Sequence, residues 1–245
     1  MSLKKHILVY SQYFHPEHFR INDLCLELVS RGDKVSVVTG IPNYPEGDFY
    51  EGYDWKNRRS ENWQGIDIYR MPIFPSGNNK ITLSINYLSF VLSAKAYQSR
   101  LPQDVDLVFT YEVSPIMQAL PAIWFARNNK LKHLLYVMDL WPENVVAMTN
   151  VKVNLIMKPL NSMVNYIYKH SDVIMASSKS FIQTIIERNV PETKMKYWPQ
   201  YAEDIYQRKC KDNTKVQIID FKEKSFVFAG NIGETQGLDI LVDAE

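Results

Sequence analysis

The amino-acid sequence predicts an α/β fold in which a doubly wound parallel sheet forms a Rossmann-like domain. Residues His6–Tyr10 are a short apolar run, typical of a strand that is buried on both faces. From Arg20 onward the apolar residues recur at helical spacing, with Gly32 as a left-handed cap, and 34–39 (KVSVVT) then predicts a second strand. Because a strand returns after a single helix, we expect a right-handed parallel crossover.

Strand and helix patterns alternate along most of the remaining chain. Further strands are predicted at 66–71, 107–110, 134–138, 172–177 and 196–198, and helices at 83–100, 114–128, 155–170 and 179–189. We therefore interpret 1–201 as one domain, with ligands expected at the carboxyl ends of its strands. Charged and polar residues dominate 202–224, which predicts a linker. A fresh strand at 225–229 and a helix start further on predict that 225–245 begins a second Rossmann-like domain and leaves it incomplete.

Composition excludes several classes of protein. Lys and Arg number 28 against 27 Asp and Glu, so the net charge of +1 argues against a general nucleic-acid binder, and we expect no nucleic acid as partner. The two cysteines, Cys25 and Cys210, lie too far apart in the sequence for a disulfide scaffold or a zinc site built on paired cysteines, which fits a reducing cytosol. Without an apolar run of about 18 residues, we expect a cytoplasmic protein that is soluble or peripheral to the membrane.

The first candidate for chemistry is the loop at 11–21, which follows the first predicted strand. It holds His15, Glu17, His18 and Arg20 at a position where such folds bind anions and sugars. The alternative is a polar surface turn that only caps the helix. The absence of a Gly-x-Gly-x-x-Gly sequence makes a nicotinamide or flavin enzyme improbable, so no cofactor is expected.

Two further strand ends carry polar and aromatic residues. Residues 40–47 form a rigid loop whose Asn43 and Tyr44 suit sugar hydroxyls, although a stiff turn explains that loop equally well. Asp139 and Trp141 follow another strand and resemble a carbohydrate-contact pair, with Asp139 also placed to act as a base. The alternative for this pair is a helix start with an Asp cap.

The segment 230–237 has the order strand, glycine-containing turn, helix, which lets backbone amides approach a diphosphate. Its candidate residues for that contact are Gly230, Asn231, Gln236 and Gly237. No Walker sequence and no cluster with the spacing of metal ligands is present, so a P-loop reaction is disfavoured and no metal is expected.

Two apolar helical stretches, 81–100 and 153–169, are flanked by lysines or arginines. Such helices either pack on the sheet or rest on a membrane surface. We favour packing on the sheet for both, because core burial is the commoner arrangement.

Taken together, these motifs resemble bacterial family-four glycosyltransferases of the GT-B fold. The resemblance is strongest to the subgroup that builds capsular, O-antigen and colanic-type polysaccharides, including fucosamine transferases. The segments that carry it are HPEHFRINDL (15–24), RGDKV (31–35), TGIPNYPEG (39–47), DLWPE (139–143), YKHSD (168–172) leading to Ser177 and Ser178, and GNIGETQGLDIL (230–241).

The resemblance implies a retaining, metal-independent transfer of a sugar from a nucleotide diphosphate sugar to a saccharide on a polyprenyl diphosphate, at the inner face of the plasma membrane. The first domain would bind the acceptor and the second the donor. Matching positions assign catalytic roles to Asp139, His15 and Glu17, and substrate contacts to Arg20, Asn43, Tyr44 and Trp141. Gly230, Asn231, Gln236 and Gly237 would approach the donor diphosphate.

Three departures from the family pattern qualify this expectation. The first loop lacks the usual glycine pair, so Arg20 would supply by its side chain what backbone amides supply elsewhere. Asn231 and Gln236 stand where relatives often carry Arg and Lys. The paired-glutamate segment that grips the donor is missing, so we expect a fragment that does not transfer sugar unaided. Two alternatives stay open, namely a GT-B-shaped sugar-nucleotide epimerase and a non-catalytic acceptor-binding subunit that needs a partner chain.

Overall fold

The computed structural model describes residues 4–143, 154–202, 228–230 and 237–243. Strands and helices alternate along the chain. The strands are β1 His6–Tyr10, β2 Lys34–Gly40, β3 Ser60–Trp63, β4 Ile66–Met71, β5 Leu107–Glu112, β6 Lys132–Val137, β7 Val173–Ala176 and β8 Met195–Tyr197. The helices are α1 Arg20–Ser30, α2 Lys80–Ala96, α3 Ala119–Asn128, α5 Asn154–His170, α6 Lys179–Ile186 and α7 Asp239–Asp243, with short 3₁₀ turns η1 Gln98–Arg100, η2 Ile116–Gln118 and η3 Glu192–Lys194.

All eight strands join one sheet in the order β3-β4-β2-β1-β5-β6-β7-β8. Every neighbouring pair is parallel except β3 and β4. From β1 the chain builds the sheet outward through β2 and β4, and it then returns to the other side of β1 to add β5 and the strands beyond it. The order therefore reverses between β1 and β5, which is where open α/β sheets bind their ligands.

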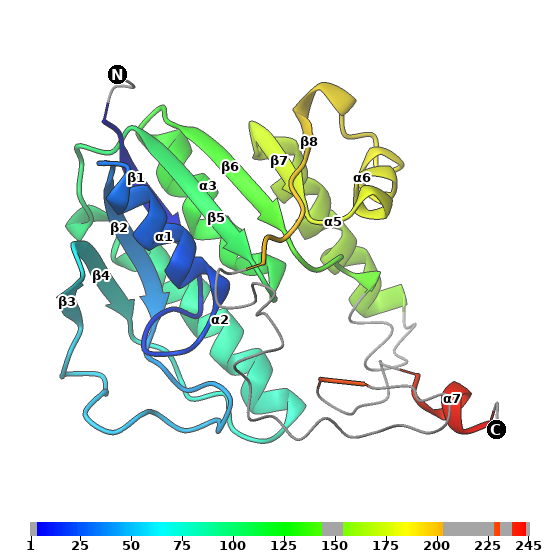
Figure 1. Cartoon of the computed structure of the whole chain (residues 1–245), viewed down its shortest axis with the longest axis horizontal. Helices are drawn as coiled ribbons and strands as arrows, with labels where there is room; N and C mark the ends of the chain where they lie inside the picture. Colours follow the sequence, from blue (N-terminus) through cyan, green and yellow to red (C-terminus); the bar gives the residue numbers. More distant parts are fainter. Residues whose placement is uncertain (1–3, 144–153, 203–227, 231–236, 244–245) are drawn as a thin grey trace, which may run out of the picture.

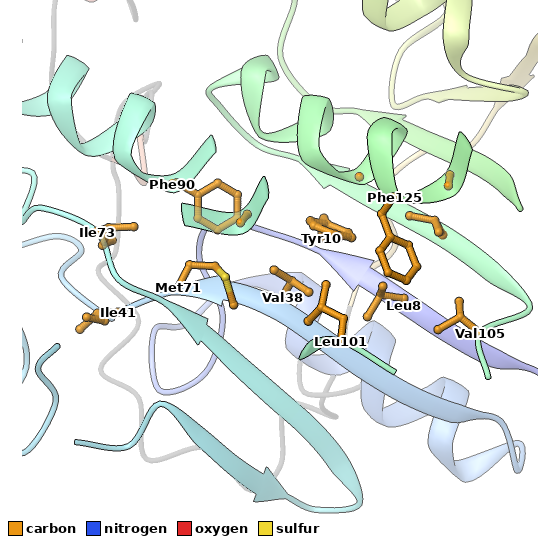
Figure 2. Packing of buried hydrophobic residues seen from close by; sticks show 14 of the residues in the cluster. Leu8, Tyr10, Val38, Ile41, Met71, Ile73, Phe90, Leu101, Val105 and Phe125 are labelled. Carbon is orange, nitrogen blue, oxygen red and sulfur yellow. The ribbon is translucent and has the colours of Figure 1, made fainter. Parts of the chain in front are cut away.

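Successive side chains of β1 point to opposite faces of the sheet, and all five of its residues are buried, so both faces are covered there. Leu8 and Tyr10 pack with Phe90 of α2 and Phe125 of α3, as Figure 2 shows. On the other face Val9 packs with Ile21 and other residues of α1. Figure 1 shows α1 in front of the sheet and α2, α3 and α5 behind it.

The structure confirms the predicted doubly wound sheet and each strand predicted within 6–198, with ends shifted by one or two residues. Gly32 has the predicted left-handed backbone, with φ of 95°. The prediction missed β3, a polar edge strand that forms a hairpin with β4 through Gln64 and Gly65. Within the predicted linker and second domain, 203–227 and 231–236 lie outside the described residues, so the division of the chain into domains stays a prediction.

Helix α2 packs on the sheet, as the sequence predicted, but it does so with one side only. Its inner residues, among them Phe90 and Val91, are buried against the sheet. Its outer side carries Ile81, Ile85, Leu88 and Leu92, all of them exposed. The helix is apolar on both sides, which a one-sided packing model does not explain.

Candidate functional site

The candidate site lies at the carboxyl ends of β1, β2, β5 and β6. These strands are neighbours around the reversal of strand order, so the loops that follow them gather at one edge of the sheet. The first two loops run from Ser11 to Phe19 and from Ile41 to Arg59, and the other two begin at Val113 and Met138. We call this edge the switch-point site.

Glu17 joins the first two of these loops. Its side chain is 1% exposed, and one carboxylate oxygen accepts hydrogen bonds from the backbone N–H groups of Asn43 (2.9 Å) and Tyr44 (2.8 Å). The other oxygen accepts from the N–H of Phe14 at 3.2 Å. Burial raises the pKa of Glu17 to about 7, although the three N–H donors act in the opposite direction. In this arrangement Glu17 holds two loops in register, and its catalytic role stays a prediction.

A group of aromatic side chains lies beside Glu17. The ring of Tyr13 stacks on Phe19 at 5.2 Å and meets Tyr44 at 5.5 Å. The hydroxyls of Tyr13 and Tyr87 share a hydrogen bond, which brings helix α2 into the site. Burial raises the pKa of both phenols, and the negative charge of Asp139 raises that of Tyr87 further. The loop after β1 is thus connected through α2 to Asp139, which follows β6.

Glu112, the last residue of β5, is a site residue that the sequence analysis missed. One of its carboxyl oxygens accepts hydrogen bonds from the N–H groups of Met138 (3.3 Å) and Asp139 (3.4 Å). The other oxygen has no hydrogen-bond partner among the described residues. Burial, together with the charge of Asp139, raises the pKa of Glu112 well above its usual range, which favours the protonated form of the group. A charged residue closing a buried strand was the available signal, but the strand was predicted to end at Thr110.

Two of the predicted site residues point elsewhere. The ring of His15 stacks on Trp63 of β3, with the ring centres 4.1 Å apart, and burial and the charge of Arg70 lower its pKa. The guanidinium of Arg20 donates to the carbonyl of Tyr201, whose hydroxyl donates to the carbonyl of Arg20 at 3.1 Å. His15 therefore lies on the β3 side of the sheet, and Arg20 lies against the segment that follows β8.

Two other predicted residues use their polar atoms inside the protein. Asn43 is 1% exposed. Its side-chain NH₂ donates to the carbonyl of Ile41 (2.9 Å), and its side-chain oxygen accepts from the N–H of Ser76 (3.1 Å). Trp141 is 8% exposed in a hydrophobic cluster, and its indole N–H donates to the hydroxyl of Ser114 at 3.2 Å. Both side chains support loops of the switch-point site, and a contact with substrate stays a prediction for each.

The structure thus brings Glu17, Tyr44 and Asp139 into one neighbourhood, and of these Tyr44 is 45% exposed. On the predicted donor side, Asn231 and Gln236 lie outside the described residues. Gly237 has a left-handed backbone, with φ of 58°. Over the described parts of the chain, no three His, Cys, Asp or Glu side chains are grouped so that they could hold a metal ion.

Comparison with known proteins gives one relative in sequence and several in fold. The chain is 24% identical to the putative colanic acid biosynthesis glycosyl transferase WcaI of Escherichia coli K12, over 97% of this chain and 61% of that protein. No family model matches. The chain therefore spans about three fifths of the length of the curated relative that it matches.

Solved structures with the same fold are glycosyltransferases of the GT-B type. Sucrose-phosphate synthase from Thermosynechococcus elongatus matches with a TM-score of 0.50 and 14% identity, over 80% of this chain and 48% of that chain. UGT89C1 from Arabidopsis thaliana, complexed with quercetin, matches with a TM-score of 0.50 and 14% identity, over 82% and 52% of the two chains. At these identities the likeness shows the fold alone, and that fold corresponds to about half of each larger enzyme.

Proposed function

We propose that this chain forms the acceptor-side domain of a glycosyltransferase in bacterial surface-polysaccharide synthesis, of the capsular, O-antigen or colanic type. The reaction moves a sugar, with retention of anomeric configuration, from a nucleotide diphosphate sugar to a saccharide carried on polyprenyl diphosphate. The domain spans 1–201, and 225–245 begins the domain that holds the donor. The protein works in the cytoplasm in peripheral contact with the inner face of the plasma membrane.

One observation carries the proposal. The reversal of strand order places a buried acid, Glu112, directly behind the backbone of Asp139, and a set of tyrosines beside it. Carboxylates and phenols both bond sugar hydroxyls, and aromatic rings cover sugar C–H faces. The similarity in sequence to a putative colanic acid glycosyl transferase supports the same class of reaction.

In the proposed reaction Asp139 faces the acceptor. The acceptor oxygen forms a bond to the anomeric carbon of the donor sugar while the bond from that carbon to the diphosphate breaks. The acceptor hydroxyl gives its proton to the Asp139 carboxylate. The carboxyl of Glu112 accepts the N–H of Asp139 and so holds that residue in place. Negative charge that develops on the diphosphate is stabilised from the donor domain, without a metal.

The test uses the complete gene product, labelled nucleotide sugars and a polyprenyl-diphosphate-linked saccharide. Label is expected to enter the lipid fraction with one donor, and addition of EDTA is expected to leave the rate unchanged. Asp139→Asn is expected to lower kcat by roughly a hundredfold or more, because the base is lost. Asp23→Asn, at an exposed residue of α1, serves as the matched control.

Three outcomes would overturn the proposal. An isomer of the nucleotide sugar formed without any acceptor would show an epimerase. Binding of the lipid-linked saccharide without transfer, restored by a second protein, would show an acceptor-binding subunit. A thermal melting temperature that no nucleotide sugar raises would leave the protein without a donor, because a ligand that binds the folded state must stabilise it.

A further inference from the structure

The outer side of α2 carries a continuous aliphatic stripe. Ile81, Ile85, Leu88 and Leu92 follow one another at intervals of four, three and four residues, so they line one side of the helix. Their exposed fractions are 73%, 44%, 53% and 66%. Single exposed aliphatic residues are common on protein surfaces, whereas a stripe along a helix marks an interaction site. We call this stripe the α2 outer face.

Two exposed aromatic residues extend this apolar surface. Trp55 and Phe74 are each 52% exposed, and their rings meet edge to face at 5.7 Å. The backbone N–H of Phe74 donates to the hydroxyl of Ser89 at 3.0 Å, which fixes Phe74 against the flank of α2. The indole N–H of Trp55 is bonded to the carbonyl of Ile73 at 2.7 Å, so burial of the ring in an apolar medium leaves no donor unpaired.

The charges in the segment that contains α2 have one sign. Between residues 68 and 103 there is no Asp or Glu, whereas Arg70, Lys80, Lys95 and Arg100 are basic. Arg70 is buried and bonded to Glu61, which leaves Lys80, Lys95 and Arg100 at the surface. Lys80 begins α2 and Lys95 lies in its last turn, so an ammonium group stands near each end of the apolar stripe.

We propose that the α2 outer face lies on an anionic phospholipid membrane, with α2 in the plane of the headgroups. Aliphatic side chains on one side of a helix enter the boundary of the acyl chains, and flanking lysines reach the headgroup phosphates. Trp and Phe are suited to the same depth. The helix lies on the membrane and does not cross it, since none of the helices in the described ranges has the length and apolar composition of a membrane span.

The opposite side of the same helix reaches the switch-point site. Asn86 is fully buried and accepts a hydrogen bond from the side chain of Gln12 at 2.6 Å, in the loop after β1. Tyr87 is hydrogen-bonded to Tyr13. A membrane-bound α2 would hold the site close to the headgroups, where a lipid-linked saccharide presents its sugar. This step rests on the proposed function, whereas the binding of lipid by α2 does not.

The test measures co-sedimentation of the complete gene product with vesicles of phosphatidylcholine, alone or mixed with phosphatidylglycerol. The wild-type protein is expected to bind the mixed vesicles more strongly. Leu88→Ser with Leu92→Ser is expected to lower the partition coefficient about tenfold or more, since two apolar side chains no longer enter the membrane. Lys80→Gln with Lys95→Gln is expected to remove the preference for phosphatidylglycerol. Tyr197→Ser, at an exposed aromatic residue of β8, is the matched control.

Equal vesicle binding by the wild-type and Leu88→Ser/Leu92→Ser proteins, both with native melting temperatures, would overturn the proposal. A concentration-dependent dimer that the same pair of substitutions abolishes would also overturn it, by showing that a second copy covers the face. Transfer to a short-chain, water-soluble acceptor separates the two proposals. If the double variant keeps transfer to the soluble acceptor and loses vesicle binding, both proposals are supported. If the wild-type protein binds vesicles but transfers sugar to no acceptor, only the proposed function fails.

Discussion

At the scale of single residues, Glu17 links the architecture of the switch-point site to pH. A buried acid with a pKa near 7 keeps its proton in the folded state at pH values where the unfolded chain, with a pKa near 4.5, has lost it. The folded state is therefore favoured at low pH, and this contribution is lost as pH rises from 4.5 to 7. The loss amounts to about 3 kcal/mol over that range.

We predict that Glu17→Gln removes this pH dependence. The amide oxygen still accepts from Asn43 and Tyr44, but the side chain no longer titrates. Urea unfolding of both proteins at several pH values between 4.5 and 8 gives the difference in their free energies of unfolding. Relative to Glu17→Gln, the free energy of unfolding of the wild-type protein is expected to fall by about 3 kcal/mol as pH rises from 4.5 to 7, and then to stay level. If the free energies of unfolding of the two proteins changed in parallel with pH over the whole range, the pKa assigned to Glu17 would be contradicted.

Glu112 acts, in our interpretation, through the backbone of Asp139. We predict that Glu112→Gln keeps kcat within about threefold of wild type, because the amide oxygen still accepts the N–H groups of Met138 and Asp139. Glu112→Ala leaves those N–H groups without an acceptor, and kcat is expected to fall by roughly tenfold or more with KM less affected. The measurement is steady-state transfer by the complete gene product. Rescue by Gln but not by Ala distinguishes positioning from general-base catalysis, in which Gln would fail as well.

At the scale of elements, α2 contributes side chains to the hydrophobic core, to the switch-point site and to the exposed surface. Its first turn is capped by Asn79, whose side chain accepts from the N–H groups of Ile81 (3.0 Å) and Thr82 (2.9 Å). We predict that Asn79→Ala lowers the free energy of unfolding by about 1 kcal/mol, as loss of a cap does in other helices. Urea unfolding provides the value. Asn78→Ala, one residue earlier and also exposed, is the control and is expected to change stability by less than about half that amount.

The strands were predictable because a parallel sheet covered on both faces needs continuous apolar runs, which are visible in the sequence. The hairpin strand β3 was not, since its residues SENW are mostly polar and lie at the sheet edge. The turn that forms this hairpin uses Gln64 and Gly65, with φ of 50° and 86°. Two consecutive residues with positive φ are typical of a tight hairpin, but Gln at the first position is not the usual residue and gave no signal.

For the site, the sequence predicted which loops would gather but not which way their side chains point. The loops follow strand ends, and strand order makes those ends neighbours. The direction of a side chain depends on partners distant in sequence, such as Trp63 for His15 and Tyr201 for Arg20. No local pattern contains that information. The sequence likewise predicted that α2 packs on the sheet but not that its outer side is exposed, since helical spacing alone does not say how many sides of a helix are covered.

At the scale of the whole molecule, His133 joins three elements of one half of the sheet. Its ring is buried between the hydroxyls of Thr110 in β5 (2.8 Å) and Ser171 after α5 (3.2 Å). The Ser171 hydroxyl already donates to the carbonyl of Ile167, so its oxygen accepts from the Nδ1–H of His133. The Nε2 atom therefore accepts from Thr110, and the network is complete only with a neutral imidazole.

Acid is expected to unfold the protein partly through this residue. Burial lowers the pKa of His133 from an ordinary 6.5 to about 3, so between these pH values the unfolded state binds a proton that the folded state does not bind. This contribution is present above pH 6.5 and is lost as pH falls toward 3, at up to 1.4 kcal/mol for each pH unit or about 5 kcal/mol in all. The contribution of Glu17 has the opposite slope between pH 4.5 and 7, so the two contributions offset one another between pH 4.5 and 6.5, and only that of His133 changes below pH 4.5.

We predict that His133→Gln, which lacks a titrating group, is less stable than wild type at pH 7 but loses less stability on acidification. Urea unfolding at pH 7, 6, 5 and 4 gives the free energy of unfolding for both proteins, and the gap between them is expected to narrow steadily as pH falls. The exposed His18→Gln substitution is the control, because it removes an imidazole without touching the hydrogen bonds of His133 to Thr110 and Ser171. Because the ring connects β5, β6 and the end of α5, hydrogen exchange at pH 4 is expected to accelerate first in those elements. A constant gap for His133→Gln, or exchange that begins in β1 and β2, would show that acid acts on the molecule through other groups.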